Sequence, residues 1–450
     1  MRMHTFSFFT ATILVAGLFA LPGPGQAMTI DECVALALRN NPGLNKNQVN
    51  VSLAEQEIRS QKAGNFGRLD FVSGYTHYNT ARTLTPMTPA TMAGDPASVP
   101  TTRNLFSSSI VYEVPLFTGF AQTRAVEIAD LSRQMAQASL LLSREQLIYN
   151  VKTLYVNILS QKRQLTAQET YAASLARLHD DTAQKLALGR LARIDVLKAA
   201  ADLQNARAVA RQIRANLAIM RGSLASLLAV DNLEELADIP VKASAMRASV
   251  AESIMEAENL QGLTRVKKEQ LNMEKADRLV EQAKSTYYPQ LNASGAYGRN
   301  YGPNDDSHSN RGDWQDQEVW QAGVNLTWNI FDFGSAKTQV QKARLAARQA
   351  RLARQETELA LKKNLLEATE KINTAISDYK SALAETKMTE ETETIEQVRF
   401  DQGASDITDL LLAKSRHRLA RGRLIDAGYR YLSNRYYLEY LLEQGGKQEQ

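Results

Sequence analysis

Two long stretches of the chain carry the hydrophobic spacing of helices. Between positions 121 and 188, and again between 335 and 402, the chain is rich in Ala, Leu, Gln, Glu, Lys and Arg. In the first stretch the apolar positions are spaced as in a coiled-coil seam and include Leu141, Ile148, Val151, Tyr155, Ile158 and Leu165. No proline lies between Leu116 and Ile239 or after Pro303, so no proline breaks either stretch. At 1.5 Å per residue, each stretch predicts a helix roughly 100 Å long.

A glycine follows each of these long stretches. Gly189 ends the first and Gly403 ends the second, and another helical segment comes after each glycine. A C-terminal glycine followed by a new helix predicts a tight antiparallel hairpin. The two turns align at a separation of 214 residues. Identical residues at aligned positions are Gly189 and Gly403, Asp195 and Asp409, Leu197 and Leu411, and Ala199 and Ala413.

Other segments repeat in the same order. Residues 40–44 resemble 259–263, residues 62–69 resemble 284–291, and Pro115–Gly119 resembles Asn329–Gly334 with the glycine displaced by one. A period above 200 residues indicates a duplicated domain. We therefore divide the chain into a first repeat at 28–230, a connector at 231–258, a second repeat at 259–442 and a polar tail at 443–450.

Four shorter segments alternate apolar and polar residues. They cover 69–79, 106–114, 291–301 and 320–330. In the last segment the apolar positions are Trp320, Ala322, Val324, Leu326, Trp328 and Ile330. Segments of about ten residues with one apolar and one polar face predict transmembrane strands, with lipid on one side and water on the other. A pair of soluble hairpins packed on a helical body is the alternative interpretation.

The surroundings of these segments extend the prediction. Residues 86–103 and 304–318 are long and polar, which suits extracellular loops. Trp320, Trp328 and Tyr301 are expected to anchor strand ends at the membrane interface. Four strands cannot close a barrel, because an open edge in lipid leaves backbone groups unpaired. Three chains together supply roughly twelve strands and leave a water-filled lumen, so we expect a trimer.

The N-terminus and the composition narrow the class of protein. Residues 1–27 have the basic start, apolar run and small-residue exit of a signal peptide, which predicts a mature chain outside the cytoplasm. The remainder contains no apolar run of about 18 residues, so no membrane-spanning helix is expected. A net charge of +4 gives no case for nucleic acid binding. Cys33, the only cysteine, is expected to pack inside a helix.

Motifs that carry chemistry are missing from the sequence. The five histidines are scattered, without carboxylates or cysteines at metal-ligand spacing. No phosphate-binding loop, nucleophile motif or dinucleotide fingerprint occurs. We therefore expect no enzyme, no cofactor and no metal site.

Several of these features together resemble the TolC family of outer-membrane efflux and secretion channels. The resemblance rests on the opening segment Ile30–Pro42, the two Phe-x-x-Gly-like strand exits and the two Gly-x5-Asp-x-Leu-x-Ala turns. It covers the mature chain almost from end to end and implies a mainly α-helical protein with β-strands. The family fold is a homotrimer with a shared twelve-stranded β-barrel in the outer-membrane lipid, a helical coiled-coil tunnel across the periplasm and an equatorial belt. Here the belt would come from residues 231–249 and the C-terminal end.

The resemblance also implies partners and a function. It implies an outer-membrane channel subunit of a Gram-negative bacterium, which forms an exit duct for efflux or type I secretion. A periplasmic adaptor and an inner-membrane transporter would dock to it. Two features depart from the family pattern. The polar tail is short, and Leu412 stands where a second acidic residue often follows Asp409.

The hairpin turns are the candidate gate, because they are the ends of the long helices farthest from the strands. Asp409, Asp406 and Asp195 would gather in a trimer and favour cations at the entrance. Arg193 and Phe400 would join hairpin to hairpin and hold the entrance shut. As the alternative, these aspartates cap the returning helices.

A competing prediction is a secreted periplasmic adaptor or structural coiled-coil protein without a pore. It shares the signal peptide and the hairpins, but it requires neither four amphipathic strands nor a duplication. Detergent-dependent extraction from the outer membrane distinguishes the two.

Overall fold

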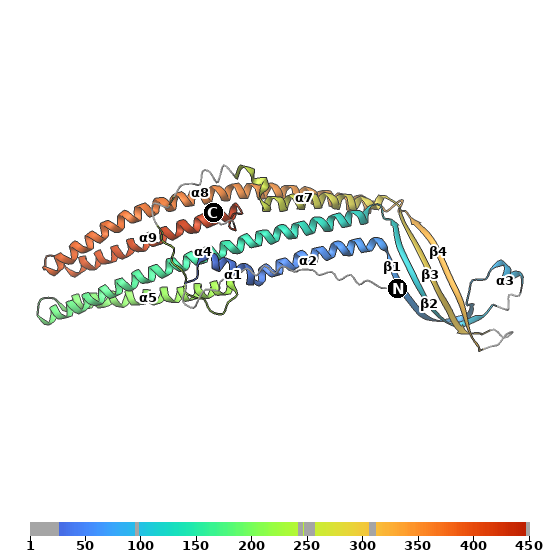
Figure 1. Cartoon of the computed structure of the whole chain (residues 1–450), viewed down its shortest axis with the longest axis horizontal. Coiled ribbons are helices and arrows are strands. Elements are labelled where there is room, and N and C mark those ends of the chain that lie inside the picture. Colours follow the sequence, from blue (N-terminus) through green and yellow to red (C-terminus); the bar gives the residue numbers. More distant parts are fainter. Residues whose placement is uncertain (1–26, 95–98, 242–245, 247–256, 306–311, 447–450) are drawn as a thin grey trace, which may run out of the picture.

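The computed structural model describes residues 27–94, 99–241, 246, 257–305 and 312–446. The predicted signal peptide lies outside this part except for its last residue, and so does most of the connector after Val241. Figure 1 shows a long rod with the β-sheet at one end and two helical hairpins at the other. The N-terminal helix α1 (Ile30–Asn40) lies near the middle of the rod.

Each repeat supplies one shorter helix, one long helix and one returning helix. In the first repeat these are α2 (Pro42–Ala63), α4 (Ala121–Ala187) and α5 (Arg193–Leu228). In the second repeat they are α7 (Thr264–Ala283), α8 (Ser335–Asp401) and α9 (Ile407–Leu441). Both long helices have 67 residues, and each ends within one residue of the predicted position. The absence of proline and the two glycines were therefore sufficient to predict the hairpins.

One antiparallel sheet joins the two repeats. Its order is β1 (Arg68–Thr83), β2 (Thr101–Phe117), β3 (Gln290–Pro303) and β4 (Trp314–Thr327). Residues opposite one another share a face, so the predicted alternation can be followed across the sheet. One row consists of Phe71, Ile110, Tyr297 and Trp320. Within the sheet, the two repeats meet where β2 pairs with β3. β1 and β4 are the two edge strands of the sheet.

The predicted strand boundaries were partly wrong. β4 begins at Trp314, inside the segment expected to be a loop, and ends at Thr327 before the expected Trp328 and Ile330. Trp320 therefore lies in the middle of its strand. The other expected loop contains the short helix α3 (Pro89–Ala93) and the start of β2. Alternation shows which residues share a face, but a strand also needs a hydrogen-bonded neighbour, and pairing decides where it ends.

A hydrophobic cluster fills the middle of the rod. Cys33, Val151, Tyr155 and Leu224 are fully buried there, and the connector residue Leu236 packs among them. The Tyr155 hydroxyl donates to the Ala237 carbonyl oxygen at 2.7 Å, which ties the connector to α4. Burial raises the pKa of the Cys33 thiol to about 12, as expected for a packed rather than a reactive cysteine.

The coiled-coil seam predicted on α4 is correct in the middle of the rod but not along the whole helix. Ile148, Val151, Tyr155 and Ile158 are buried. Leu141 is exposed, because no helix in the described part of the chain covers that side of α4. A heptad pattern predicts a contact without saying which chain supplies it.

The C-terminal end holds the two repeats together. The Glu443 carboxylate accepts hydrogen bonds from the Thr264 and Arg265 backbone amides at 2.6 and 3.1 Å, and it pairs with the Arg265 side chain. The Gly445 amide donates to Glu145 of α4 at 2.9 Å. Residues 443–446 thereby bridge the start of α7 and the middle of α4.

Candidate functional site

The hairpin ends are built identically in the two repeats. In the first, Gly189 has φ +72° and donates to the Leu186 carbonyl at 2.9 Å, while Arg190 donates to Lys185 at 2.8 Å. In the second, Gly403 has φ +74° and donates to Phe400 at 3.1 Å. This pair of bonds closes a helix through a left-handed residue, a conformation that glycine adopts without a Cβ clash. Both turn glycines thus have the predicted role.

The returning helices begin with the predicted aspartates. Asp406 is the N-cap of α9, and its carboxylate accepts hydrogen bonds from the Thr408 and Asp409 amides, the latter at 3.2 Å. Asp195 lies in the first turn of α5 and accepts from the Ala192 amide at 3.3 Å. Asp409 occupies the equivalent place in α9 and is exposed. The structure therefore shows the capping role for Asp406 and Asp195, and it leaves their charges at the surface.

The charge of Asp406 is the most firmly held of the three. Hydrogen bonds from the Thr408 side chain and backbone and from the Asp409 amide lower its pKa, since they stabilise the ionised form. Its place at a helix N-terminus favours the same form. Arg193 is the first residue of α5, two residues before Asp195, and it is exposed.

Phe400 lies between the two hairpins. The ring is buried, and the ammonium of Lys185 from the first hairpin lies 4.5 Å from its centre. The same ammonium pairs with Asp401 at 3.2 Å, and Lys198 of α5 donates to the Thr408 hydroxyl at 3.0 Å. Two lysines of the first hairpin therefore bind the tip of the second within one chain.

An apolar cluster continues this contact away from the tips. It joins residues of α4 and α5 to residues of α8 and α9, and its buried members are Leu175, Leu178, Ala199, Leu203, Ala206, Phe400, Ile407, Leu410 and Leu411. Separating the hairpins exposes this surface to water, which costs about 25 cal/mol for each Å² of apolar area. The contact between the two hairpin tips thus rests on packing as well as on the lysines.

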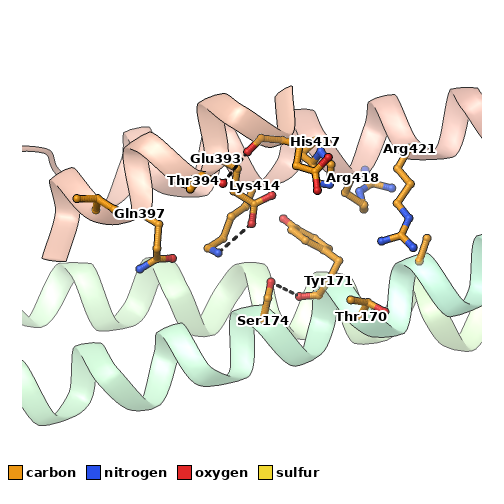
Figure 2. Close-up of a pocket in the computed structure, with 13 residues that line it drawn as sticks. Thr170, Tyr171, Ser174, Glu393, Thr394, Gln397, Lys414, His417, Arg418 and Arg421 are labelled. Atoms are coloured by element: carbon orange, nitrogen blue, oxygen red, sulfur yellow. Dashed lines mark hydrogen bonds and ion pairs between the residues drawn. The ribbon is translucent and has the colours of Figure 1, made fainter. Parts of the chain in front are cut away.

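A polar cleft of about 410 Å³ lies farther along the same junction. Figure 2 shows Tyr171 and Ser174 facing Glu393, Lys414 and Arg418 of the second hairpin. Lys414 is buried and pairs with Glu393 at 3.1 Å. The guanidinium of Arg418 lies over the Tyr171 ring at 5.6 Å and donates to Gln168. The ion pair joins α8 to α9 within the second hairpin, and removing one partner of a buried pair costs several kcal/mol. Arg418 is the side chain of this cleft that crosses to the first hairpin, through Tyr171 and Gln168.

Sequence reasoning missed the lysines at 185, 198 and 414. Each lies on a helix whose charged residues are mostly solvated, and nothing local distinguishes it from its neighbours. Lys185 and Lys198 have partners in the other repeat, more than 200 residues away, whereas Lys414 pairs with Glu393 within its own hairpin.

Two features are absent from the described residues. Among them no group of three or more His, Cys, Asp or Glu is placed to hold a metal ion. In the same part of the chain, every helix is too short or too polar to cross a membrane.

Comparison with known proteins identifies the family. A family model described as outer membrane efflux protein matches residues 33–230 and 258–442. The chain belongs to this family. Outer membrane protein TolC of Salmonella enteritidis is 24% identical over 436 residues, which cover 93% of this chain and 82% of the relative. The matched ranges leave out the connector, as the predicted duplication does.

Solved structures of two membrane proteins have the same fold. The CmeC outer membrane channel of Campylobacter jejuni superposes with a TM-score of 0.73 at 17% identity, covering 93% of this chain and 86% of that one. A membrane protein from Pseudomonas aeruginosa reaches a TM-score of 0.76 at 16% identity, with 92% of each chain covered.

Family membership decides the general function. The protein is a component of the outer membrane and forms part of an exit duct, not an enzyme. Channels of this family form trimers and work with adaptors and inner-membrane transporters. The predicted resemblance is confirmed, and the alternative of an adaptor without a pore finds no support.

Proposed function

We propose that three copies of this chain form a duct from the periplasm through the outer membrane, for efflux or type I secretion. A periplasmic adaptor and an inner-membrane transporter dock at the hairpin end and supply the cargo. The observation that carries this proposal is the four-stranded sheet, whose edges β1 and β4 have no partner strand in the described chain. Open edges in lipid leave backbone groups unsatisfied, so the sheet closes with copies of itself.

The two faces of the sheet support a barrel with lipid outside and water inside. Opposite residues on one face are large and apolar, and they are more than one-third exposed in the single chain: Leu69, Phe71, Tyr75, Phe106, Ile110, Tyr112, Tyr297, Trp320, Val324 and Leu326. The other face carries Ser107, Ser109, Asn292, Ser294, Gln321 and Asn325. Exposed apolar surface of this extent marks a contact with lipid or protein. The polar face then lines the lumen.

The helical part supports association of the same copies. On α8, Leu345, Leu352, Leu359 and Leu366 follow one another at intervals of seven and are 57–67% exposed. Leucines at heptad spacing form a seam for another helix. On α2, Val49 and Leu53 are likewise exposed. A neighbouring copy covers these side chains, and the tunnel wall continues from chain to chain.

The hairpin turns form the entrance of this duct. Three copies bring together the carboxylates of Asp406, Asp409 and Asp195, of which Asp406 and Asp195 already cap the starts of their helices. Capping and cation selection are compatible, since a capping carboxylate keeps its charge and one oxygen remains free for solvent. Phe400 and Lys185 hold the hairpins together, Arg193 extends this contact to the next copy, and a docked adaptor replaces the contacts when the duct opens.

The test is the mass of the complex extracted from outer membranes in detergent. We expect a trimer that conducts ions in planar bilayers, with conductance lost when the sheet is disrupted. A monomer as the stable species, or release of the protein without detergent, would rule the proposal out. Reconstitution with an adaptor hairpin should then raise the open probability of the wild-type channel.

A further inference from the structure

The apolar face of the sheet carries charged side chains near its outer end, the end farthest from the helices (Figure 1). On this face Tyr297 lies opposite Trp320. One row farther from the helices, Arg299 of β3 lies opposite Glu318 of β4. The Arg299 guanidinium also donates a hydrogen bond to the Asp316 carboxylate and forms an ion pair with it. Asp316 and Glu318 are exposed and the Arg299 side chain is 49% exposed, so these charges are open to their surroundings.

The height of these charges in the membrane follows from the length of the strands. Toward the helices, the same face of β4 is apolar and includes Val324 and Leu326. β3 begins at Gln290, nine residues before Arg299, which is about 30 Å along an extended strand. At the tilt of about 35–45° found in outer-membrane barrels, this corresponds to roughly 23 Å of height, close to the apolar band of about 25 Å. Arg299 therefore lies where the hydrocarbon ends and the head groups of the outer leaflet begin.

Aromatic rings cover the same face beyond the charges. Tyr301 lies opposite Phe106, one row farther out than Arg299. The centre of the Phe106 ring is 4.6 Å from that of Tyr75 and 5.3 Å from that of Trp314. Trp314 is 64% exposed and Tyr75 is 55% exposed, so both rings are available for contact. From the helices outward, the face therefore presents apolar side chains, then charges, then aromatic rings.

We propose that this part of the sheet binds a phosphorylated glycolipid of the outer leaflet. The inference rests on the proposed barrel, in which the apolar face meets lipid. The acyl chains lie against Trp320 and the apolar rows, the phosphate accepts hydrogen bonds from Arg299, and the sugar packs on Phe106 and Trp314. A phospholipid brings a phosphate to the same height but no sugar to the rings beyond it. The order of hydrocarbon, phosphate and sugar in the lipid thus matches the order of side chains on the protein.

The two carboxylates add a divalent cation to this site. Asp316 and Glu318 together outweigh the single positive charge of Arg299, so they would repel a phosphate that arrived without a counterion. Mg²⁺ binds through one or two carboxylates together with phosphate oxygens and does not need a cage made by the protein alone. The site therefore takes the phosphate with its divalent cation. Arg299 holds the phosphate, and the carboxylates hold the ion.

The site is complete within one chain. β3 lies between β2 and β4, and the charges are on the face of the sheet rather than along its edges. Partner copies join at the edges and leave this face open to lipid. Each copy in the ring therefore carries its own site.

Binding is tested with the purified complex in vesicles of defined composition. Phosphatidylethanolamine vesicles receive lipid A, dephosphorylated lipid A or phosphatidylglycerol, each with Mg²⁺, and a further sample receives inorganic phosphate without added lipid. Native mass spectrometry counts the lipid bound per complex, and gel mobility after heating gives the temperature of dissociation. We expect about tenfold more lipid A than phosphatidylglycerol to bind at equal content. Removing the phosphates of lipid A, or chelating Mg²⁺, should abolish this excess.

Variants of the charged and aromatic residues locate the site. Arg299→Gln should lower lipid A binding about tenfold and leave assembly in phosphatidylethanolamine unchanged. Because this change leaves Asp316 without its partner, Arg299→Gln with Asp316→Asn is the second variant. Gln317→Ala, on the polar face next to Glu318, is the matched control and should bind lipid A like the wild type. Trp314→Leu should weaken the binding of lipid A but not of phosphatidylglycerol.

The outcomes separate this inference from the proposed function. A trimer that binds lipid A no better than its dephosphorylated form, or no better than phosphatidylglycerol, would overturn the glycolipid site and leave the duct intact. Equal stabilisation by inorganic phosphate would overturn it in favour of a site for a free anion. Lipid A binding that neither Arg299 variant changes would place the lipid elsewhere on the sheet. A monomer in every vesicle would overturn the barrel and this inference with it.

Discussion

The long helices α4 and α8 have equal length and equivalent places in the two repeats, but they differ in their surroundings. α4 packs mainly against α2 and α5 of its own repeat and against α7 and α9 of the other. α8 packs mainly against α7 and α9, and four of its leucines stay exposed. In the proposed ring, α2 and α5 of a neighbouring chain would complete the surroundings of α8. The ring proposal therefore predicts that the repeat is a unit of sequence and the assembled ring the unit of stability.

The largest effect on assembly is expected from a charged residue on the apolar face of the sheet. Val324→Arg should reduce the amount of assembled trimer in the outer membrane at least tenfold, because Arg near the bilayer midplane costs roughly 2–4 kcal/mol on the lipid face. Asn325→Arg, its neighbour on the polar face, should assemble nearly as well as the wild type. Quantifying trimer on unheated gels checks this, and equal loss in both variants would indicate a soluble sheet.

The exposed leucines of α8 give the next largest effect. Leu352→Ser combined with Leu359→Ser should lower the temperature at which the trimer dissociates, since burying each leucine contributes about 1.5–3 kcal/mol. Gln355→Ser on the same helix is the control and should leave this temperature unchanged. Thermal dissociation followed by gel mobility is the measurement. An unaltered midpoint in the double variant would mean that no neighbouring copy covers these side chains.

Loosening the hairpin tips should have a smaller effect. Lys185→Ala removes an ion pair with Asp401 and a cation–π contact with Phe400, which together contribute about 1–2 kcal/mol. Single-channel recordings should show the variant channel open several times more often, and Arg193→Ala should also open more readily. Arg190→Ala, at an exposed site of the same turn, is the control. If both variants stay closed like the control, the lysine and the arginine stabilise the turn without gating it.

Charge and capping can be separated at the start of α9. Asn caps helices about as well as Asp, so Asp406→Asn removes the charge and keeps the cap, whereas Asp406→Ala loses about 1 kcal/mol of capping. We expect the Asn variant, combined with Asp409→Asn, to show a weaker cation preference with normal stability. The Ala variant should in addition unfold more readily. Reversal potentials in a salt gradient measure the preference, and wild-type potentials in the doubly neutralised channel would exclude a pore role.

The pH dependence of this preference should be the smallest effect. Hydrogen bonds hold the pKa of Asp406 below its ordinary value of 3.8, so the group remains ionised as the pH falls to that value. Its contribution to stability is complete above the ordinary pKa and is lost as the pH falls through the lowered one. In an Asp409→Asn channel, cation preference should persist at pH 3.8. Titration of that preference with a midpoint above this value would contradict the assigned hydrogen bonds.

Local sequence patterns predicted the elements that depend on local physics. Long proline-free stretches and turn glycines at 189 and 403 predicted both hairpins to within a residue, because helices form from bonds between near neighbours. Strand ends were predicted less well, because a strand ends where its hydrogen-bonded neighbour ends. β4 ends at Thr327, where no partner strand continues beside it.

The candidate site was predicted in outline only. Glycines and aspartates were found because they recur at the same spacing in both repeats. Lys185 and its contact with Phe400 were missed, because that contact lies between unlike positions of the two repeats. Residues that recur in both repeats can be identified from a single sequence. Contacts between the repeats are identified only from the structure.

The two open strand edges have a consequence for the life of a newly made chain. Until partners arrive, β1 and β4 present free amides and carbonyls to any extended polypeptide in their compartment. Completing a ring requires encounters among several such chains, so the waiting time lengthens steeply when expression is low. Arg68 with Asp70 on β1, and Asp316 with Glu318 on β4, place charges along these edges and discourage indiscriminate pairing. The same edges that allow a closed ring thus make the lone subunit the stage most exposed to aggregation and to proteases.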